Sequence, residues 1–263
     1  EKAKDSKISK CEKELTKIKE RIQSTRGQQA VFRKAISMLI DNTFFDKLDT
    51  NHHLIPTVDC KCVDLNTGKI IKRTKEHCFT REMPYEYDST LNLTELTSKI
   101  LNPICCNDAE LLSDLQLQMG LFLSGLVVRK FFIYHGDGRN GKSTLMNYLN
   151  KIAGGYIGIL NKTTLIETDG KMSANAHTSQ LMPLRGMRAG IIDEIKQEDR
   201  INPEMIKKIA SGEPIKVRAA YSKKEETLNL CAKGILCIND IPNFDGADQA
   251  VNDRLICVPF NAR

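Results

Sequence analysis

The sequence predicts an α/β fold, a parallel sheet with helices on both faces, preceded by a smaller, mainly helical part with a β-hairpin. Three observations predict it. Continuous apolar runs alternate with helical stretches after residue 130, a glycine-rich loop joins the first of these runs to its helix, and turn residues separate two short β-type runs upstream. Apolar runs of this kind are typical of parallel strands that are buried on both faces.

Residues 1–45 are predicted to be helical and basic. Apolar residues recur at steps of three and four, as on a helix that packs one face, and a break is expected near Gly27. Residues 1–34 carry eleven Lys and Arg against five Asp and Glu, so the net charge of +6 belongs to this segment. The segment is either a solvated helix or a surface for a phosphate backbone, and the sequence leaves both open. The apolar set is Ile8, Cys11, Leu15, Ile18 and Ile22.

Residues 46–128 differ in character and are predicted to form an accessory domain. The turn sequence Asn66-Thr67-Gly68 lies between the runs 62–65 and 69–72, which predicts a β-hairpin. The last part of this region, residues 93–128, has the apolar spacing of helices.

Nine cysteines are scattered along the chain without the dense spacing of a disulfide framework, which favours a reducing compartment. Cys60, Cys62 and Cys78, with His52 and His53 nearby, raise the alternative of a zinc site. The C-x-C spacing lacks a second pair to close such a site, so ordinary buried thiols are favoured. No apolar run approaches the ~20 residues that a membrane span needs.

Residues 129–263 are predicted to form a P-loop ATPase domain. Four short apolar runs have the character of buried strands, and residues 143–152 form a helix after the first of them. Strands separated by helices imply a parallel sheet that is covered on both faces. The four runs are 131–134, 189–192, 235–238 and 255–258.

The glycine-rich loop after the first strand has the pattern G-x-x-x-x-G-K-S and precedes a helix, as a phosphate-binding loop requires. Its glycines let backbone N–H groups turn toward phosphates, and the helix N-terminus favours negative charge. Lys142 is expected to supply a positive charge to the β- and γ-phosphates of ATP, and Ser143 a hydroxyl ligand to Mg²⁺. The loop consists of Gly136, Asp137, Gly138, Arg139, Asn140, Gly141, Lys142 and Ser143.

Two acidic residues end the second apolar strand. Asp193 is expected to hold the metal ion, directly or through water, and Glu194 to orient and polarise the attacking water. Acidic residues also follow strands and cap helices without any catalytic role. Their place after a strand that follows a phosphate loop favours the hydrolytic interpretation.

Polar residues also lie at the third and fourth strands. Asn239 ends the third strand, where its amide would bind the attacking water; the alternative is a turn-forming Asn before Pro242. Arg254 precedes the fourth strand. It either reaches the nucleotide of a neighbouring subunit or pairs on the surface with Asp253 or Asp248, and the sequence leaves both open.

These elements resemble those of the superfamily 3 helicases, in particular the poxvirus-type primase–helicases of large DNA viruses, phages and mobile elements. The resemblance extends from about Asp49 to the end of the chain. Asn140 and Thr144 match the family's G-x-G-x-N-G-K-S-T loop beyond the generic pattern. Asp253-Arg254 stands where the family often has paired arginines, so the arginine-finger role depends on Arg254 alone. Further similar segments are 184–194, 209–221 and 254–260.

The resemblance implies an AAA+-type domain that forms a homo-oligomeric, hexameric ring and translocates on single-stranded DNA at a replication fork. It implies a primase domain or other replication proteins as partners, no membrane, and the cytoplasm (viral factory) or nucleus of an infected cell. It also implies a hairpin between Glu194 and Asn239 that projects into the pore, where basic residues contact DNA phosphates. These residues are Lys216, Arg218, Lys223 and Lys224; for the last two, a charged hairpin tip is the alternative.

Two other functions are consistent with the sequence. A non-unwinding AAA+ ATPase, such as an initiator, loader or packaging factor, would bind DNA and assemble with ATP without separating strands. A P-loop kinase for small molecules would need neither Asn239 nor Arg254 and would release a phosphorylated product. The start at Glu1, the abrupt end at Arg263 and the lack of a visible primase domain predict a fragment of a longer protein.

Overall fold

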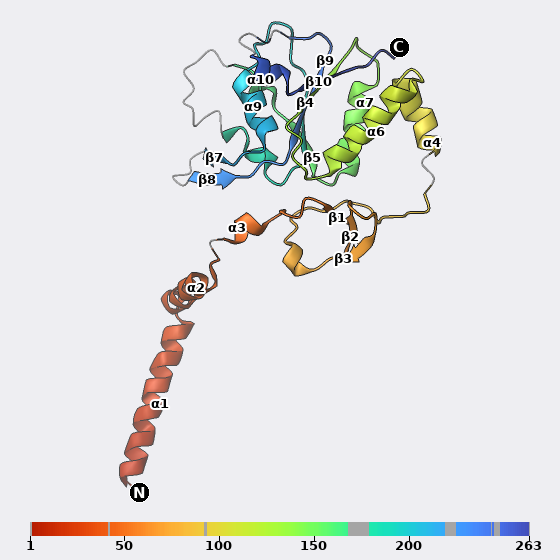
Figure 1. Ribbon diagram of the computed structural model, residues 1–263. Coiled ribbons are helices and arrows are strands. Elements are labelled where there is room, and N and C mark those ends of the chain that lie inside the picture. Colours follow the sequence, from red (N-terminus) through yellow and green to blue (C-terminus); the bar gives the residue numbers. More distant parts are fainter. Residues whose placement is uncertain are drawn as a thin grey trace. The chain divides into compact units, whose positions relative to one another are not determined.

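The structure is a computed structural model that describes residues 2–41, 43–91, 94–167, 179–218, 225–242, 244 and 248–262. Its contacts divide the chain into two compact units, Glu1–Lys47 and Leu48–Arg263. The second unit contains nearly all of the predicted accessory domain together with the predicted P-loop domain (Figure 1).

The first unit consists of helices α1 (Lys2–Gln23), α2 (Thr25–Leu39) and α3 (Phe44–Lys47). The break between α1 and α2 falls at Ser24 rather than at Gly27, because the Ser24 side chain caps α2 by accepting the N–H of Gly27 at 3.1 Å. A Cβ on Gly27 would lie 1.7 Å from the carbonyl oxygen of Arg21, so the bend requires glycine there.

The second unit begins with an antiparallel three-stranded sheet of β1 (Leu54–Pro56), β2 (Lys61–Asp64) and β3 (Ile70–Lys72), followed by the short helix η1 (Lys75–His77). The predicted hairpin is confirmed by the pairing of β2 with β3. Its turn is closed by the Asp64 carboxylate, which accepts the N–H of Asn66 at 2.9 Å, and by Gly68 at φ 67°.

The helical stretch that follows is interrupted. It comprises α4 (Thr94–Leu96), the π-helical turn η2 (Thr97–Leu101), α5 (Asn102–Ile104) and α6 (Ala109–Leu123). The prediction of helix as far as residue 128 is wrong, because α6 ends at Leu123 and Ser124 has an extended backbone. Beyond that point Gly125 donates its N–H to the carbonyl of His52 at 2.8 Å, in a close approach that leaves no room for a Cβ.

The main sheet has five parallel strands in the order β10–β4–β9–β6–β5. The α/β prediction is therefore confirmed, but β5 was not predicted. Across the sheet, the strands are therefore the fifth, first, fourth, third and second of the five along the chain. They are β4 (Phe131–His135), β5 (Ile157–Leu160), β6 (Ala189–Ile192), β9 (Lys233–Ile238) and β10 (Leu255–Pro259).

Helices cover both faces of this sheet, as the sequence predicts (Figure 1). On β4, Phe131 and Ile133 pack with α9 (Pro203–Ser211) and α10 (Gln249–Asn252). The alternate residues Phe132 and Tyr134 pack with α6 and α7 (Lys142–Ile152). Both faces of β4 are buried, which explains its uninterrupted apolar sequence. Two short 3-10 helices, η3 (Lys162–Thr164) and η4 (Met182–Leu184), lie in the connections.

Strands β7 (Ile215–Arg218) and β8 (Glu225–Leu228) form a separate antiparallel pair between β6 and β9 in the chain. The hairpin that the family resemblance implied is therefore present. Lys216 and Arg218 lie on β7, whereas Lys223 and Lys224 lie outside the described residues.

Two buried cations lie where β6 and β9 begin. Arg188, 3% exposed, donates to the carbonyls of Leu123 and Leu54, each at 2.6 Å, and its guanidinium lies 4.3 Å from the ring centroid of Tyr156. Lys233, 2% exposed, donates to the carbonyl of Ser124. These contacts join the first strand of the small sheet and the end of α6 to the main sheet.

The zinc alternative is not supported. Among the residues that the structure describes, no three His, Cys, Asp or Glu side chains lie together as metal ligands. Cys62 is buried on β2, whereas Cys60 is exposed at a left-handed turn position, so the two side chains differ in environment. None of the helices in the described part of the chain combines the length and apolar character needed to cross a membrane.

Candidate functional site

A cavity of about 650 Å³ lies where the main strands end, and it is lined by residues from four separate segments of the sequence. The carboxyl ends of parallel strands meet at one edge of a sheet, which is the usual place for a ligand in such folds. Five predicted site residues line the cavity: Lys142, Ser143, Asp193, Glu194 and Asn239.

The glycine-rich loop is held against the end of the last strand. The buried Asn140 side chain donates to the carbonyl of Phe260 at 2.7 Å. Gly136 has a φ of 152°, and a Cβ there would lie 2.2 Å from the same carbonyl oxygen. Asn140 and Gly136 therefore hold the loop against Phe260, the residue that follows β10, and Gly136 leaves no room there for a side chain.

The loop continues directly into α7. Gly141 has a φ of 88° and caps the helix, and Ile104 of α5 packs where its Cβ would stand. Ser143 and Thr144 lie exposed in the first turn of α7, where backbone N–H groups have no partner within the helix. Asp137 and Gly138 are exposed at the tip of the loop, with Arg139 in a left-handed conformation at φ 69°. This arrangement presents a helix N-terminus to an anion.

Lys142 is buried and folds back over its own loop. Its ammonium donates to the carbonyls of Gly136 and Asp137 and to the side-chain oxygen of Asn140, the last at 2.9 Å. Burial lowers the pKa of Lys142 below its ordinary value, while the carboxylate of Asp193 opposes this shift. The cation is thus held by neutral acceptors, which an anion would readily replace.

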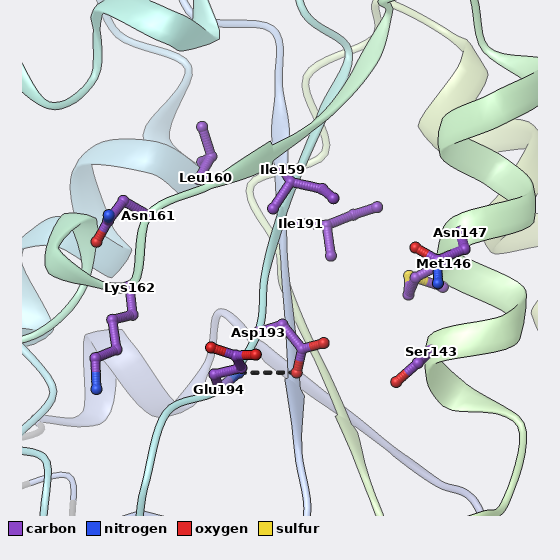
Figure 2. A pocket seen from close by; sticks show the side chains of 10 residues that line it. All are labelled: Ser143, Met146, Asn147, Ile159, Leu160, Asn161, Lys162, Ile191, Asp193 and Glu194. Atoms are coloured by element: carbon purple, nitrogen blue, oxygen red, sulfur yellow. Dashed lines mark hydrogen bonds between the residues drawn. The ribbon is translucent and has the colours of Figure 1, made fainter.

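The two acidic residues follow β6 and face the cavity, and both are exposed. Glu194 has a φ of 63°, a left-handed conformation that is uncommon for this residue type. Its N–H donates to the carboxylate of Asp193 at 2.8 Å, the dashed line in Figure 2. In Figure 2 the Glu194 carboxylate lies on the side of Lys162, whereas the Asp193 carboxylate lies on the side of Ser143.

A second cavity of about 420 Å³ adjoins the first and extends between α7 and β5. Figure 2 shows Ser143 on one side and Lys162 on the other, with Asp193 and Glu194 between them. Ser143 and Asp193 are oxygen donors of the kind that Mg²⁺ prefers, and their exposed side chains reach the same end of the cavity. The donor set therefore fits a magnesium ion.

Lys162 was missed by the sequence reasoning. It follows β5, the strand that was not predicted, and its own neighbourhood contains no motif. The one available signal was a lysine after a short apolar run, Ile157–Leu160, and that signal is weak by itself.

Asn239 follows β9, which lies between β4 and β6. Asn239 therefore lies near the phosphate loop, as expected, and its exposed side chain lines the larger cavity. Cys237 lines it too; burial raises the pKa of this thiol to about 12, so it stays protonated and neutral.

Arg254, Lys216 and Arg218 do not line this cavity. Arg254 immediately precedes β10, which runs parallel to β4. It therefore lies at the amino ends of the strands, whereas the phosphate loop lies at their carboxyl ends. Its guanidinium donates to the carbonyl of Ala250 and is partly buried. Lys216 is exposed on β7, and Arg218 lies 3.7 Å from the carboxylate of Glu225.

Comparison with known proteins finds two matching family models and several viral relatives. Residues 2–111 match the family described as "D5 N terminal like", and residues 134–254 match one described as "Family of unknown function (DUF5906)". The chain is 25% identical over 253 residues to a protein of Acanthamoeba polyphaga mimivirus named "putative helicase", which covers 94% of this chain and 26% of that protein. A "putative primase" of African swine fever virus is 24% identical over 250 residues, covering 92% of this chain and 26% of that protein. The chain is therefore similar, over most of its length, to viral proteins named as a helicase and a primase.

The chain spans about a quarter of the length of the curated relatives that it matches. Its fold is shared with the C-terminal region of NrS-1, at a TM-score of 0.52 and 14% identity, over 74% of this chain and 43% of that one. The likeness to NrS-1 concerns the fold alone.

Proposed function

We propose that this chain carries the ATPase motor of a DNA helicase that serves viral or mobile-element replication. One observation carries the proposal: polar residues from four separate segments converge on one cavity at the carboxyl ends of the parallel strands. Their chemical types suit the hydrolysis of a nucleoside triphosphate. The relatives, which include a "putative helicase" and a "putative primase", favour DNA replication as the setting.

In this proposal the phosphates of ATP lie along the loop and the N-terminus of α7, where backbone N–H groups point at them. Lys142 exchanges its carbonyl acceptors for oxygens of the β- and γ-phosphates. Ser143 and Asp193 would hold Mg²⁺, which neutralises charge on the phosphates. Glu194 orients and polarises the attacking water as a general base, and Asn239 donates a hydrogen bond to the same water.

The proposal includes a ring, a hexamer by family resemblance. Arg254 lies at the edge of the sheet opposite the cavity of its own subunit, so it can contact a nucleotide only in a neighbouring subunit. There its guanidinium would stabilise negative charge that develops on the transferred phosphoryl group. Lys216 and Arg218 on β7 would contact phosphates of single-stranded DNA, together with Lys223 and Lys224 beyond the described residues.

The wider setting is part of the same proposal. The motor would act with a primase domain or other replication proteins, in the cytoplasmic factory or nucleus of an infected cell. The alternative is a non-unwinding AAA+ ATPase, such as an initiator, loader or packaging factor, which would assemble on DNA with ATP without separating strands.

The test measures ATP hydrolysis by the full chain with and without single-stranded DNA, while light scattering reports particle size. Wild type is expected to hydrolyse ATP, faster with DNA, and Lys142→Ala to lose at least about 100-fold of that rate because its charge acts on the transferred phosphate. Lys151→Ala is the matched control, since Lys151 is exposed at the far end of α7.

Hydrolysis that survives in Lys142→Ala would refute the assigned site. A wild-type chain that stays monomeric and ignores DNA would refute the helicase proposal for this chain. Assembly on DNA with hydrolysis but without strand separation would favour the initiator or loader alternative.

A further inference from the structure

A second lysine faces the proposed nucleotide site and has no part in the mechanism above. Lys162 begins the turn after β5 and lines both cavities, whereas Lys142 lines only the larger one. Its side chain is 36% exposed, so it is free to move without leaving the protein surface. The two lysines therefore approach the larger cavity from different walls, one from α7 and one from the end of β5.

The position of Lys162 relative to the carboxylates suggests what it binds. In Figure 2 its ammonium lies at the same end of the cavity as Glu194, while Ser143 lies across the cavity. Asp193 lies between them. A ligand between the two sides of the cavity would thus meet the magnesium-type donors Ser143 and Asp193 on one side and the flexible cation of Lys162 on the other.

Lys162 has a weak partner. Its ammonium lies 3.4 Å from the carboxylate of Asp199, which also accepts the N–H of Lys196 at 2.9 Å. A long, partly exposed ion pair of this kind contributes little to stability and exchanges easily. When Lys162 leaves, the carboxylate of Asp199 still accepts the hydrogen bond from the backbone N–H of Lys196.

The backbone around Lys162 is fixed, so that the side chain alone needs to move. Asn202 donates its N–H to the carbonyl of Leu165 at 2.7 Å, and Glu167 donates its N–H to the carbonyl of Arg200 at 2.9 Å. These bonds join the turn after β5 to the segment that follows the acidic pair. Lys162 is therefore presented from a rigid base, as a binding residue requires.

We propose that Lys162 exchanges Asp199 for the terminal phosphate of the bound nucleotide and so makes the cavity prefer a nucleoside triphosphate over a diphosphate. The inference depends on the proposed function, because it assigns a second cation to that same site. A diphosphate lacks the group that Lys162 contacts, whereas Lys142 and the loop hold the phosphates common to both nucleotides. The competing explanation is that Lys162 only stabilises the turn after β5 through its ion pair with Asp199.

The experiment measures the Kd of a non-hydrolysable ATP analogue and of ADP, both with Mg²⁺, for the full chain. Lys162→Met is expected to weaken binding of the ATP analogue about tenfold, the size of one hydrogen bond to a charged group, and to leave ADP within about twofold. Lys162→Arg keeps the positive charge and is expected to restore most of the preference. Lys151→Met, an equal loss of charge at an exposed site outside both cavities, is the matched control.

Asp199→Asn separates the two explanations. If Lys162 acts on the phosphate, this variant binds the ATP analogue at least as tightly as wild type, because it removes the anion that competes for Lys162. If Lys162 only braces the turn, Asp199→Asn weakens binding as Lys162→Met does, and the inference is overturned. Equal weakening for the ATP analogue and ADP in Lys162→Met would overturn it as well.

Failure of the proposed function is distinguishable from failure of this inference. Wild-type protein that binds neither nucleotide would refute both. Wild-type protein that binds the ATP analogue while Lys162→Met binds it equally well would refute the role of Lys162 alone.

Discussion

Lysine and arginine side chains have different surroundings at the two ends of the parallel strands, which are called here the carboxyl edge and the amino edge of the sheet. At the carboxyl edge, Lys142 and Lys162 face a cavity and have neutral or weakly held partners. At the amino edge, Arg188 and Lys233 are almost completely buried, and backbone carbonyls at and just beyond the C-terminal end of α6 accept their hydrogen bonds. Those carbonyls carry partial negative charge, which suits a cation. One edge keeps its cations available to a ligand, while the other uses them to hold secondary structure together.

The comparison predicts that charge changes at the carboxyl edge alter activity without altering stability. Glu194→Gln is expected to reduce the rate of ATP hydrolysis at least about 100-fold, because the amide cannot accept a proton from the attacking water. Its thermal midpoint should stay within about 2 °C of wild type, since the side chain is exposed. Phosphate release and a thermal melt measure the two quantities.

Glu213→Gln is the control for that variant, because Glu213 is exposed in the turn after α9 and lies outside both cavities. Unchanged hydrolysis in Glu194→Gln would contradict the catalytic assignment. Binding of a non-hydrolysable ATP analogue should persist, which separates loss of chemistry from loss of the nucleotide.

Charge changes at the amino edge should do the reverse. Arg188→Met is expected to lower the free energy of unfolding by about 3 kcal/mol, because it leaves the buried carbonyls of Leu54 and Leu123 without donors. Urea denaturation measures the change. Arg200→Met, at an exposed position, should change stability by less than about 0.5 kcal/mol. Equal stability of Arg188→Met and wild type would show that these carbonyls find other partners.

The smallest expected effect is the pH dependence of stability that comes from the buried Lys233. Burial lowers its pKa to about 8 from 10.5, so between these values the unfolded chain holds a proton that the folded chain has lost. The folded state therefore gains stability as pH rises through this window, by up to about 1 kcal/mol per pH unit. Lys233→Met should remove this rise.

The measurement is the difference in unfolding free energy between wild type and Lys233→Met at a series of pH values. The difference cancels the titration of other groups. A difference that does not change with pH between about 8 and 10.5 would show that the Lys233 ammonium is not destabilised by burial.

Signals that lie within one stretch of chain were readable from the sequence. The phosphate loop, the strand before it and the helix after it are contiguous, so residues 131–152 could be assigned from pattern alone. The hairpin of β2 and β3 was found because its turn residues lie between its strands. The acidic pair was found because it ends an apolar run.

Only the tertiary structure decided which of these segments meet. The order β10–β4–β9–β6–β5 places Asn239, which follows β9, beside the phosphate loop, whereas Arg254, which precedes β10, lies at the opposite ends of the strands. It also brings Lys162 to the cavity. This residue follows β5, a four-residue edge strand that contains a glycine and has no strong hydrophobic periodicity. Likewise, Arg188 and Lys233 look like ordinary surface cations until packing buries them against the end of α6. Local patterns fix local structure because neighbouring residues share one backbone, whereas strand order and burial depend on contacts between distant segments.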